Sequence, residues 1–485
     1  KRIIQDTQDC SYKTQKIQTE EKFRKPSPPF ITSTLQQEAS RRLRLSPSQA
    51  MRVAQQLYEG IEIGPEGQEG LITYMRTDST NVAVSALEET SKYVLEKFGE
   101  KYVSKSHRRY SRKVMGAQEA HEAIRPTSVF RTPNSIKSYL SSEQFRLYEL
   151  IWKRMIASQM PDAIFDNKTI DIVTNNSQSG DKYIFQIVGS KLKFDGFRAI
   201  YIEGIDDESD SINGKSNDLP DLQQDETVEC LDKIAEQNFT KPPNRFSEAS
   251  LIRALEKEGI GRPSTYATIV KTIQERDYVI KEKGRFIPTK LGRQVTYFLK
   301  EYIPNIMDVK FTAKIEKQLD EIAEGLVGYN PVLSKFYTPF TKDLGNAETA
   351  PRIDRALLDE ETEFVCEKCE RPMVIKSGRN GRFLACTGFP ECKNAKSLPI
   401  GIDCPKCKYS LVERKFKGRV FYACSGYPEC EFTVDRKPVS QPCHQCDSGG
   451  GLLVPYRRDT LQCVICKSTC EISEDGIGVN QAINI

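Results

Sequence analysis

The decapeptide LITYMRTDST at residues 71–80 places a tyrosine two positions before an arginine. Residue character alternates along 70–78, which predicts a strand with Tyr74 and Arg76 on one side. A phenol with a pKa near 10 is only about one part in a thousand ionised at pH 7, so a nucleophilic tyrosine needs a nearby cation. Arg76 is placed to be that cation. The alternative, an ordinary strand tyrosine in a core, stays open on these residues alone.

Cysteines supply a second kind of chemistry, because 13 of the 15 follow position 365 in three spaced sets. The first two sets read CxxC, sixteen residues, C, five residues, C, and the third opens identically. Four thiolates in two pairs suit tetrahedral Zn²⁺, and modules this small need a metal to fold. A disulfide framework in a secreted domain is the alternative. The predicted zinc ligands are Cys366, Cys369, Cys386, Cys392, Cys404, Cys407, Cys424, Cys430, Cys443, Cys446, Cys463 and Cys470.

The final ligand of the third set is ambiguous, because both Cys466 and Cys470 follow Cys463. The first two sets space their last pair widely, which favours Cys470.

Basic and aromatic residues lie between the cysteine pairs of the first two predicted zinc ribbons. Arg382 and Phe383 occupy the first ribbon, and Arg419 and Tyr422 the second. Cations that hold phosphates and aromatic faces that stack on unpaired bases bind single strands without sequence preference, at about 1–3 kcal/mol per stacked base. The pattern predicts binding of single-stranded DNA, and the alternative that the aromatics only complete a small core stays open.

Residues 246–300 have the order of a winged-helix domain: helix, turn, helix, hairpin. Ser247 is the predicted N-cap of the first helix, and Ser264 or Thr265 caps the second. Two short alternating stretches around a Lys-Gly pair then indicate a hairpin. The GIGRPST junction between the helices aims backbone N–H groups and Arg262 at one point, which predicts a phosphate site. A tight turn with a solvated arginine is the alternative.

Two further local patterns concern the elements around these sites. Ser85 and Glu88 predict a capping box for a helix that ends at Gly99. The alternating stretches TIDIVT and KYIFQIVG predict strands in 161–240, and residues 169–173 are expected to form an unpaired sheet edge.

Three motifs in series, ITYMRTDST at 72–80, QEAHEAIRP at 118–126 and GIGRPSTYA at 259–267, precede the cysteine sets. The chain thereby resembles the bacterial type IA DNA topoisomerases, and Met75 favours the topoisomerase I branch. The resemblance implies that Tyr74 becomes a 5′-phosphotyrosine and that Arg76 holds the scissile phosphate. It also assigns catalysis to His121 and DNA contacts to Arg125, Arg262 and Thr265.

The resemblance implies ATP-independent relaxation of negatively supercoiled DNA by single-strand cleavage, strand passage and religation. Family members begin with a Toprim domain whose acidic cluster binds Mg²⁺, and the comparable acids here, residues 206–210, lie in a Ser/Asn/Gly-rich stretch. The chain is therefore expected to be a C-terminal portion that binds single strands without relaxing supercoils alone. Two other classes are a non-catalytic single-stranded DNA-binding or scaffold protein, and a tyrosine recombinase, whose nucleophile usually lies near the C-terminus.

The predicted fold class is multidomain α+β, with a helical tyrosine domain and a winged-helix domain joined by a β-rich gate domain and followed by three zinc ribbons. The expected boundaries are 1–30 for the first gate limb, 31–160 for the tyrosine domain, 161–240 for the return limb with an acidic loop at 203–226, 241–345 for the winged helix, and 352–398, 399–437 and 438–485 for the ribbons.

Composition sets the remaining expectations. The 485 residues suffice for three or four domains, and 38% hydrophobic content supports packed cores. The 71 basic and 67 acidic residues leave a net charge of only +4, so any polyanion site must be local. No run approaches the 18 or more apolar residues of a membrane helix. A monomer in the cytoplasm, associated with the nucleoid, is expected, or an organellar protein if the source is eukaryotic.

Overall fold

The computed structural model describes residues 2–110, 121–175, 177, 179–204, 219–351, 359–378, 381–416, 419–443, 445–446, 451–457, 460–472 and 478–479. The chain forms two compact units, Lys1–Ala350 and Pro351–Ile485.

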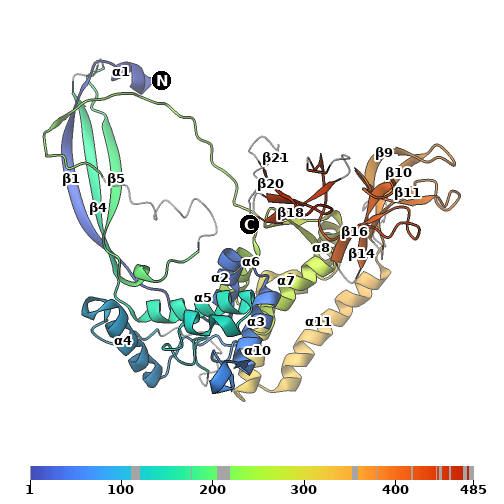
Figure 1. Ribbon diagram of the computed structural model, residues 1–485, viewed down its shortest axis with the longest axis horizontal. Helices are drawn as coiled ribbons and strands as arrows, with labels where there is room; N and C mark the ends of the chain where they lie inside the picture. Colours follow the sequence, from blue (N-terminus) through green and yellow to red (C-terminus); the bar gives the residue numbers. More distant parts are fainter. Residues whose placement is uncertain are drawn as a thin grey trace. The chain divides into compact units, whose positions relative to one another are not determined.

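A four-stranded antiparallel sheet in the first unit is built from segments far apart in the sequence. Its order is β5 (Ile184–Phe194), β4 (Ala163–Asn175), β1 (Ser11–Arg24) and β6 (Thr227–Val228). Strands β1, β4 and β5 run side by side in Figure 1. The sheet begins close to the short helix α1 (Arg2–Asp6), since β1 follows it directly in the chain.

The prediction that residues 169–173 form an unpaired edge is wrong. They lie in β4, which pairs with β1 on one side and β5 on the other; Thr169 faces both Gln18 and Val188. The chain reverses after β4 and adds β5 as the next strand, so β5 and β6 form the edges of this sheet.

A helical module lies between β1 and β4 in the sequence. It contains α2 (Thr32–Glu38), the π-helical turn η1 (Ala39–Leu43), α3 (Pro47–Glu59), α4 (Val84–Phe98) and α5 (Ser142–Gln159), with the small pair β2 (Ile61–Glu62) and β3 (Gln68–Glu69). Side chains from these helices, among them Leu35, Leu57, Tyr148, Ile151 and Ile156, are fully buried in one core. The core fixes the loops that connect the helices.

Two local predictions in this module are wrong. Residues 71–77 form no regular strand and make only an isolated bridge, Ile72 with Pro126, because their neighbour is the irregular segment 123–127 rather than a sheet. The capping box at Ser85 is also wrong: α4 begins at Val84 after Ala83, whose side chain cannot cap. Ser85 therefore lies inside the first turn.

The two helices and the hairpin predicted within 246–300 form in the predicted order, as α6 (Glu248–Lys257), α7 (Tyr266–Glu275), β7 (Val279–Glu282) and β8 (Arg285–Pro288). Helix α8 (Lys290–Tyr302), which was not predicted, follows them. Ser247 caps α6, accepting a hydrogen bond from the Ser250 amide at 3.1 Å. Ile252, Tyr266, Val270 and Phe286 form the core of this module. Three more helices complete the unit: α9 (Pro304–Met307), α10 (Val309–Ala323) and α11 (Tyr329–Thr349).

The second unit consists of three small antiparallel sheets, one per cysteine set. The first contains β9 (Glu360–Val365), β10 (Pro372–Gly378), β11 (Gly381–Cys386) and β12 (Ala395–Ser397). The second contains β13 (Pro399–Asp403), β14 (Ser410–Phe416), β15 (Arg419–Cys424) and β16 (Thr433–Val434). The third contains β17 (Val439–Pro442), β18 (Leu452–Arg457), β19 (Thr460–Cys463), β20 (Thr469–Ile472) and β21 (Gly478–Val479).

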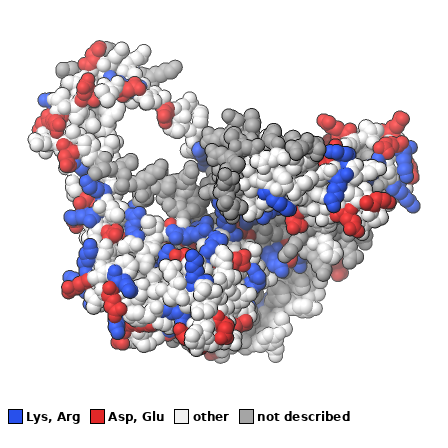
Figure 2. Space-filling view, viewed as in Figure 1, with Lys and Arg blue, Asp and Glu red and all other residues white. Residues whose placement is uncertain are grey.

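Charged side chains of both signs are interspersed on the face of the molecule that Figure 2 shows. This distribution agrees with the small net charge of +4. Within the described ranges, no helix combines the length and apolar character needed to cross a bilayer.

Candidate active site and zinc centres

Tyr74 lies at the surface beside two other rings. Its side chain is 37% exposed, and its ring centroid lies 5.4 Å from that of Tyr58 and 5.6 Å from that of His121. Tyr58 belongs to α3, whereas His121 precedes the segment 123–127. The core interpretation of Tyr74 therefore does not fit its position, and two of the three predicted catalytic side chains are in contact.

The segment 123–127 is held against Tyr74 by its neighbour, Thr73. The Thr73 amide donates to the Arg125 carbonyl at 2.9 Å, and the Thr73 hydroxyl accepts from the Arg125 amide at 3.0 Å. The same hydroxyl donates to the Ala123 carbonyl at 2.6 Å. These bonds explain how a histidine far along the chain comes to lie beside Tyr74.

On the other side of Tyr74, residues 75–77 are attached to the start of α2. The Thr32 hydroxyl lies 2.8 Å from the Met75 carbonyl oxygen and accepts from the Thr77 amide at 2.9 Å. The Thr32 amide donates to the Thr77 carbonyl at 2.9 Å. The sequence reasoning missed Thr32, and a lone threonine at a helix start carries no signal for such a role.

Arg76 projects from the segment between these two attachments. Its side chain is exposed, like that of Tyr74, and among the described residues no carboxylate forms an ion pair with it. A guanidinium in this situation keeps its fork available for a phosphate.

Arg125, a predicted DNA contact, is already paired. Its Nε donates to Glu122 Oε2 at 2.7 Å, its Nη1 donates to the Pro126 carbonyl at 3.0 Å, and its side chain is 13% exposed. The structure therefore places Arg125 in a local ion pair that braces the segment 123–127 rather than at the surface.

A cavity of about 500 Å³ separates α2 and residues 77–78 from the α6–α7 junction and α10. Arg262 lines it, but its Nη2 lies 2.7 Å from Asp320 Oδ2 and its Nε 3.6 Å from Glu316 Oε2. Thr265 is the N-cap residue of α7 without a capping side-chain bond, since its hydroxyl accepts from the Arg262 amide at 2.8 Å. Burial of Tyr266 in the same wall raises the pKa of its phenol to about 12.

Three clusters of four cysteines fit tetrahedral zinc. In each, all four Sγ atoms lie within 4.8 Å of one another. The pairs Cys366–Cys392 and Cys404–Cys430 have Sγ–Sγ distances of 3.7 Å, close to the edge expected when four sulfurs lie about 2.3 Å from one ion. Asn394 Nδ2 donates to Cys366 Sγ at 3.2 Å, the kind of outer contact that orients a thiolate ligand.

The preference for Cys470 in the third cluster is wrong. The four gathered cysteines are Cys443, Cys446, Cys463 and Cys466, with Cys443 Sγ 3.6 Å from Cys466 Sγ. Cys470 lies within β20, opposite Leu461 of β19, so the sheet holds it away from the cluster. In the third ribbon both pairs of zinc ligands are therefore closely spaced in the sequence, whereas in the first two ribbons the second pair is widely spaced.

The ribbon residues predicted to bind DNA are placed differently from one another. Tyr422 is 8% exposed and belongs to a core, which fits the core alternative, whereas Phe383 is half-buried. Arg382 pairs with Glu360 of β9. The side chain of Arg419 lies outside the described residues.

Two exposed aromatics that the sequence reasoning missed occupy equivalent positions in the first two ribbons. Phe389 is 66% and Tyr427 69% exposed, and each precedes a proline in the repeated segments GFPEC and GYPEC. That repeat is the signal that could have identified them, because an aromatic residue kept at the surface in two copies is not needed by either core.

The chain was compared with known proteins. The family model for DNA topoisomerase matches residues 1–334, and the model for the topoisomerase DNA-binding C4 zinc finger matches residues 363–400 and 401–439. The structure of full-length topoisomerase I from Thermotoga maritima is 35% identical, with a TM-score of 0.62; the match covers 86% of this chain and 64% of that one. The chain therefore belongs to the type IA DNA topoisomerase family.

Proposed function

We propose that Tyr74 is the nucleophile of an ATP-independent topoisomerase that relaxes negatively supercoiled DNA. The phenolic oxygen attacks a backbone phosphorus and loses its proton, the bond from phosphorus to the 3′ oxygen breaks, and that oxygen leaves as a 3′-hydroxyl. The product is a 5′-phosphotyrosine. Because one phosphate ester replaces another, the reverse reaction reseals the strand without an external energy source.

The observation that carries this proposal is the placement of Tyr74 and Arg76 on one short segment. Both side chains are exposed, while the backbone between them is fixed from both sides by Thr73 and Thr32. The Arg76 guanidinium can hold the phosphate and neutralise its charge during transfer, an effect of positioning and charge stabilisation. His121, in ring contact with Tyr74, is proposed to hydrogen-bond the same phosphate.

The remaining modules are proposed to hold the DNA, which is single-stranded or negatively supercoiled. The cavity lined by Arg262 would receive a backbone phosphate, with Thr265 holding the Arg262 amide beside it, and the zinc ribbons would stack on unpaired bases. The domain boundaries expected from the sequence are part of the same proposal, as are monomeric state and location in the cytoplasm.

Zn²⁺ and Mg²⁺ need different ligands. The cysteine clusters supply soft thiolates that suit Zn²⁺ as a structural ion. Mg²⁺ prefers carboxylate oxygens, and the groups of candidate ligands found in the described residues are all cysteines, which do not fit it. The acids at 206–210 lie outside the described residues. No step proposed here for Tyr74, Arg76 or His121 passes through a magnesium ion.

Trapping the covalent intermediate tests the proposal. The protein is mixed with a negatively supercoiled plasmid and with an oligonucleotide labelled at either end, and then denatured. A protein joined to the 5′ end of the cut strand, lost in Tyr74→Phe, is the expected result. A 3′ linkage would indicate a recombinase, and binding without any adduct would indicate a non-catalytic DNA-binding protein.

A further inference from the structure

We propose that Thr32 is a positioning residue for strand cleavage. Its hydroxyl fixes the backbone on both sides of Arg76, so that Tyr74 and Arg76 are presented to the same phosphate. The inference rests on the proposed nucleophilic role of Tyr74 and adds a residue that lies outside the three sequence motifs.

The contacts of Thr32 are directed at two successive peptide groups. Its hydroxyl can donate to the Met75 carbonyl at 2.8 Å while accepting from the Thr77 amide at 2.9 Å. Its own amide donates to the Thr77 carbonyl at 2.9 Å. The two peptide groups that the hydroxyl contacts are those before and after Arg76. A single buried side chain therefore determines the direction in which that arginine leaves the backbone.

The segment needs such an anchor because it has no sheet to belong to. Residues 71–77 make one isolated bridge, at Ile72, and no strand ladder holds Met75 or Thr77. Buried backbone groups without partners are costly, and here the Thr32 side chain acts as the partner that a neighbouring strand would normally supply. Thr32 and Thr77 are 0% and 1% exposed, so water does not replace this bond.

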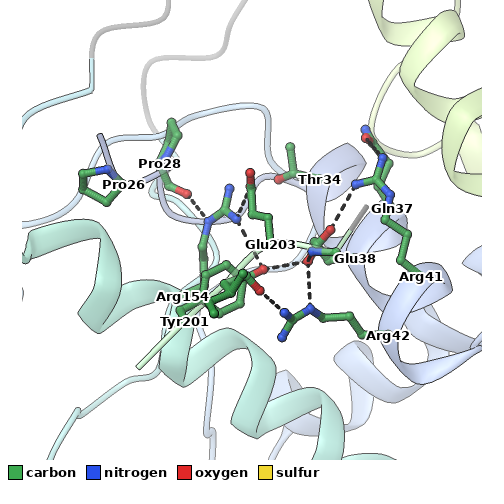
Figure 3. A network of polar contacts seen from close by, with 12 residues as sticks. Pro26, Pro28, Thr34, Gln37, Glu38, Arg41, Arg42, Arg154, Tyr201 and Glu203 are labelled. Atoms are coloured by element: carbon green, nitrogen blue, oxygen red, sulfur yellow. Dashed lines mark hydrogen bonds and ion pairs between the residues drawn. The ribbon is translucent and has the colours of Figure 1, made fainter. Parts of the chain in front are cut away.

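The position of Thr32 is itself fixed, because the C-terminal end of α2 is also held by hydrogen bonds. Glu38, at the last position of the helix, accepts hydrogen bonds from the Tyr201 hydroxyl at 2.8 Å and from the Gly204 amide at 3.0 Å. Figure 3 shows Glu38 at the centre of a network with Arg41, Arg42 and Tyr201. Helix α2 is therefore attached at one end to the return of the chain from the sheet and at the other to the Tyr74 segment.

Loss of the hydroxyl should act on chemistry and not on DNA affinity. The Thr32 hydroxyl makes its hydrogen bonds to the backbone on either side of Arg76, and the side chain is buried, so it offers no contact to DNA. A displacement of about 1 Å in a reacting group costs on the order of a hundredfold in rate. Thr32→Val keeps the shape of the side chain and removes the hydroxyl, whereas Thr32→Ser keeps the hydroxyl.

The test measures three quantities on the same protein: the single-turnover rate of adduct formation, the affinity for a single-stranded oligonucleotide, and the midpoint of thermal unfolding. Thr32→Val should lose on the order of a hundredfold in rate with affinity unchanged within about twofold, and Thr32→Ser should recover most of the rate. Thr90→Val is the matched control. Thr90 is equally buried, and its hydroxyl donates to the Ala86 carbonyl at 2.6 Å within α4.

Three results would overturn the inference: a Thr32→Val protein that cleaves as fast as the unchanged protein, a loss of rate that Thr90→Val reproduces at equal loss of stability, or no recovery in Thr32→Ser. Failure of the proposed function itself looks different. In that case the unchanged protein forms no adduct, or Tyr74→Phe forms as much, and both proposals fall together.

Discussion

Arg262 and Asp320 form an ion pair at the wall of the cavity, with Nη2 2.7 Å from Oδ2, and Glu316 one helical turn earlier approaches the same guanidinium. Two carboxylates of α10 thus occupy the fork that a DNA phosphate is proposed to use. A phosphate must displace them in order to bind.

Asp320→Asn should therefore raise the affinity for single-stranded DNA. Both side chains are about 30% exposed, so the competing pair is worth roughly 0.2–1 kcal/mol, which corresponds to a gain of up to about fivefold. Fluorescence anisotropy of a labelled oligonucleotide at low salt measures it. Glu321→Gln is the matched control, since it removes one charge from α10 but disrupts a pair with Lys317 instead. Lower affinity in Asp320→Asn would mean that the carboxylate positions Arg262 for DNA.

Arg76→Ala should lose cleavage and religation far more than binding. Removing one group that stabilises developing charge costs on the order of a hundredfold to a thousandfold in rate, whereas one phosphate contact among many changes affinity modestly. Arg76→Lys keeps the charge but not the planar fork and should recover only part of the activity. Adduct yield and oligonucleotide affinity, measured side by side, separate the two effects. Equal losses of adduct yield and of oligonucleotide affinity would mean that Arg76 only contacts DNA and does not act in cleavage.

The exposed ribbon aromatics should contribute directly to binding of single strands. Phe389→Ala and Tyr427→Ala are each expected to lower affinity by about 1–3 kcal/mol if a base stacks on the ring, with zinc content unchanged. Tyr422→Ala should instead destabilise the second ribbon, because Tyr422 is buried in its core. Anisotropy titrations together with zinc analysis distinguish these outcomes. If a protein carrying both Phe389→Ala and Tyr427→Ala bound single strands as tightly as the unchanged protein, these two rings would not be the stacking surface.

Zinc content discriminates between the two candidate ligands of the third ribbon. The unchanged chain should hold three ions, Cys466→Ser should hold two, and Cys470→Ser should hold three, because only Cys466 lies in the cluster. Chelation should unfold the ribbons and spare the module of α6, α7, β7 and β8, which has a core of its own. Loss of an ion from Cys470→Ser alone would contradict the structure.

The network of Figure 3 should matter for the stability of the first unit. Arg154 is 3% exposed; its Nη1 pairs with Glu203 and its Nε donates to the Pro28 carbonyl at 2.6 Å. Arg154→Met should cost about 3 kcal/mol, the lower end for a broken buried pair, since Glu203 is half-exposed. Urea unfolding measures it. Arg52→Met, which breaks an exposed pair with Glu143, should cost less than about 1 kcal/mol.

The same pair gives the stability of this unit a defined dependence on pH. Partial burial opposes ionisation of Glu203, but the charge and hydrogen bond of Arg154, with smaller contributions from Ser27 and Arg41, outweigh it and hold the pKa of that carboxyl below its ordinary value. Its contribution is therefore complete above the ordinary carboxyl pKa and is lost as the pH falls through the lowered one. The difference in unfolding free energy between the unchanged protein and Arg154→Met should shrink in that acid range and stay constant from pH 6 to 8.

Local patterns predicted some parts of the molecule well and others badly, for physical reasons. Ser247, the α6–α7 core and the first two cysteine clusters follow from short-range spacing, so the sequence was sufficient for them. The strand at Tyr74 was wrong because alternation reports which side chains are buried, not which backbone lies alongside. Here the partner is the irregular segment 123–127.

The contacts that surround the candidate site mostly join residues far apart in the sequence. The residue types next to a position do not indicate which distant residue it contacts. Nothing near Thr32 indicates that its hydroxyl meets Met75, and nothing near Arg262 indicates the carboxylate of Asp320. Cys470 illustrates a different limit: its wide spacing from Cys463 resembled that of the last pair in the first two repeats, but strand pairing with Leu461 decided the outcome.

The register of β1 with β4 places Arg24 directly opposite Ala163. The whole tyrosine-bearing module is thus an insertion whose entry and exit lie next to each other, as in domains that tolerate transplantation. A short turn could join Arg24 to Ala163 and leave the paired strands as a simple hairpin, and the excised module could close on itself as a circular polypeptide. In evolutionary terms, the tyrosine-bearing module is a unit that could be exchanged together with residues 197–204, because Tyr201 packs in its core.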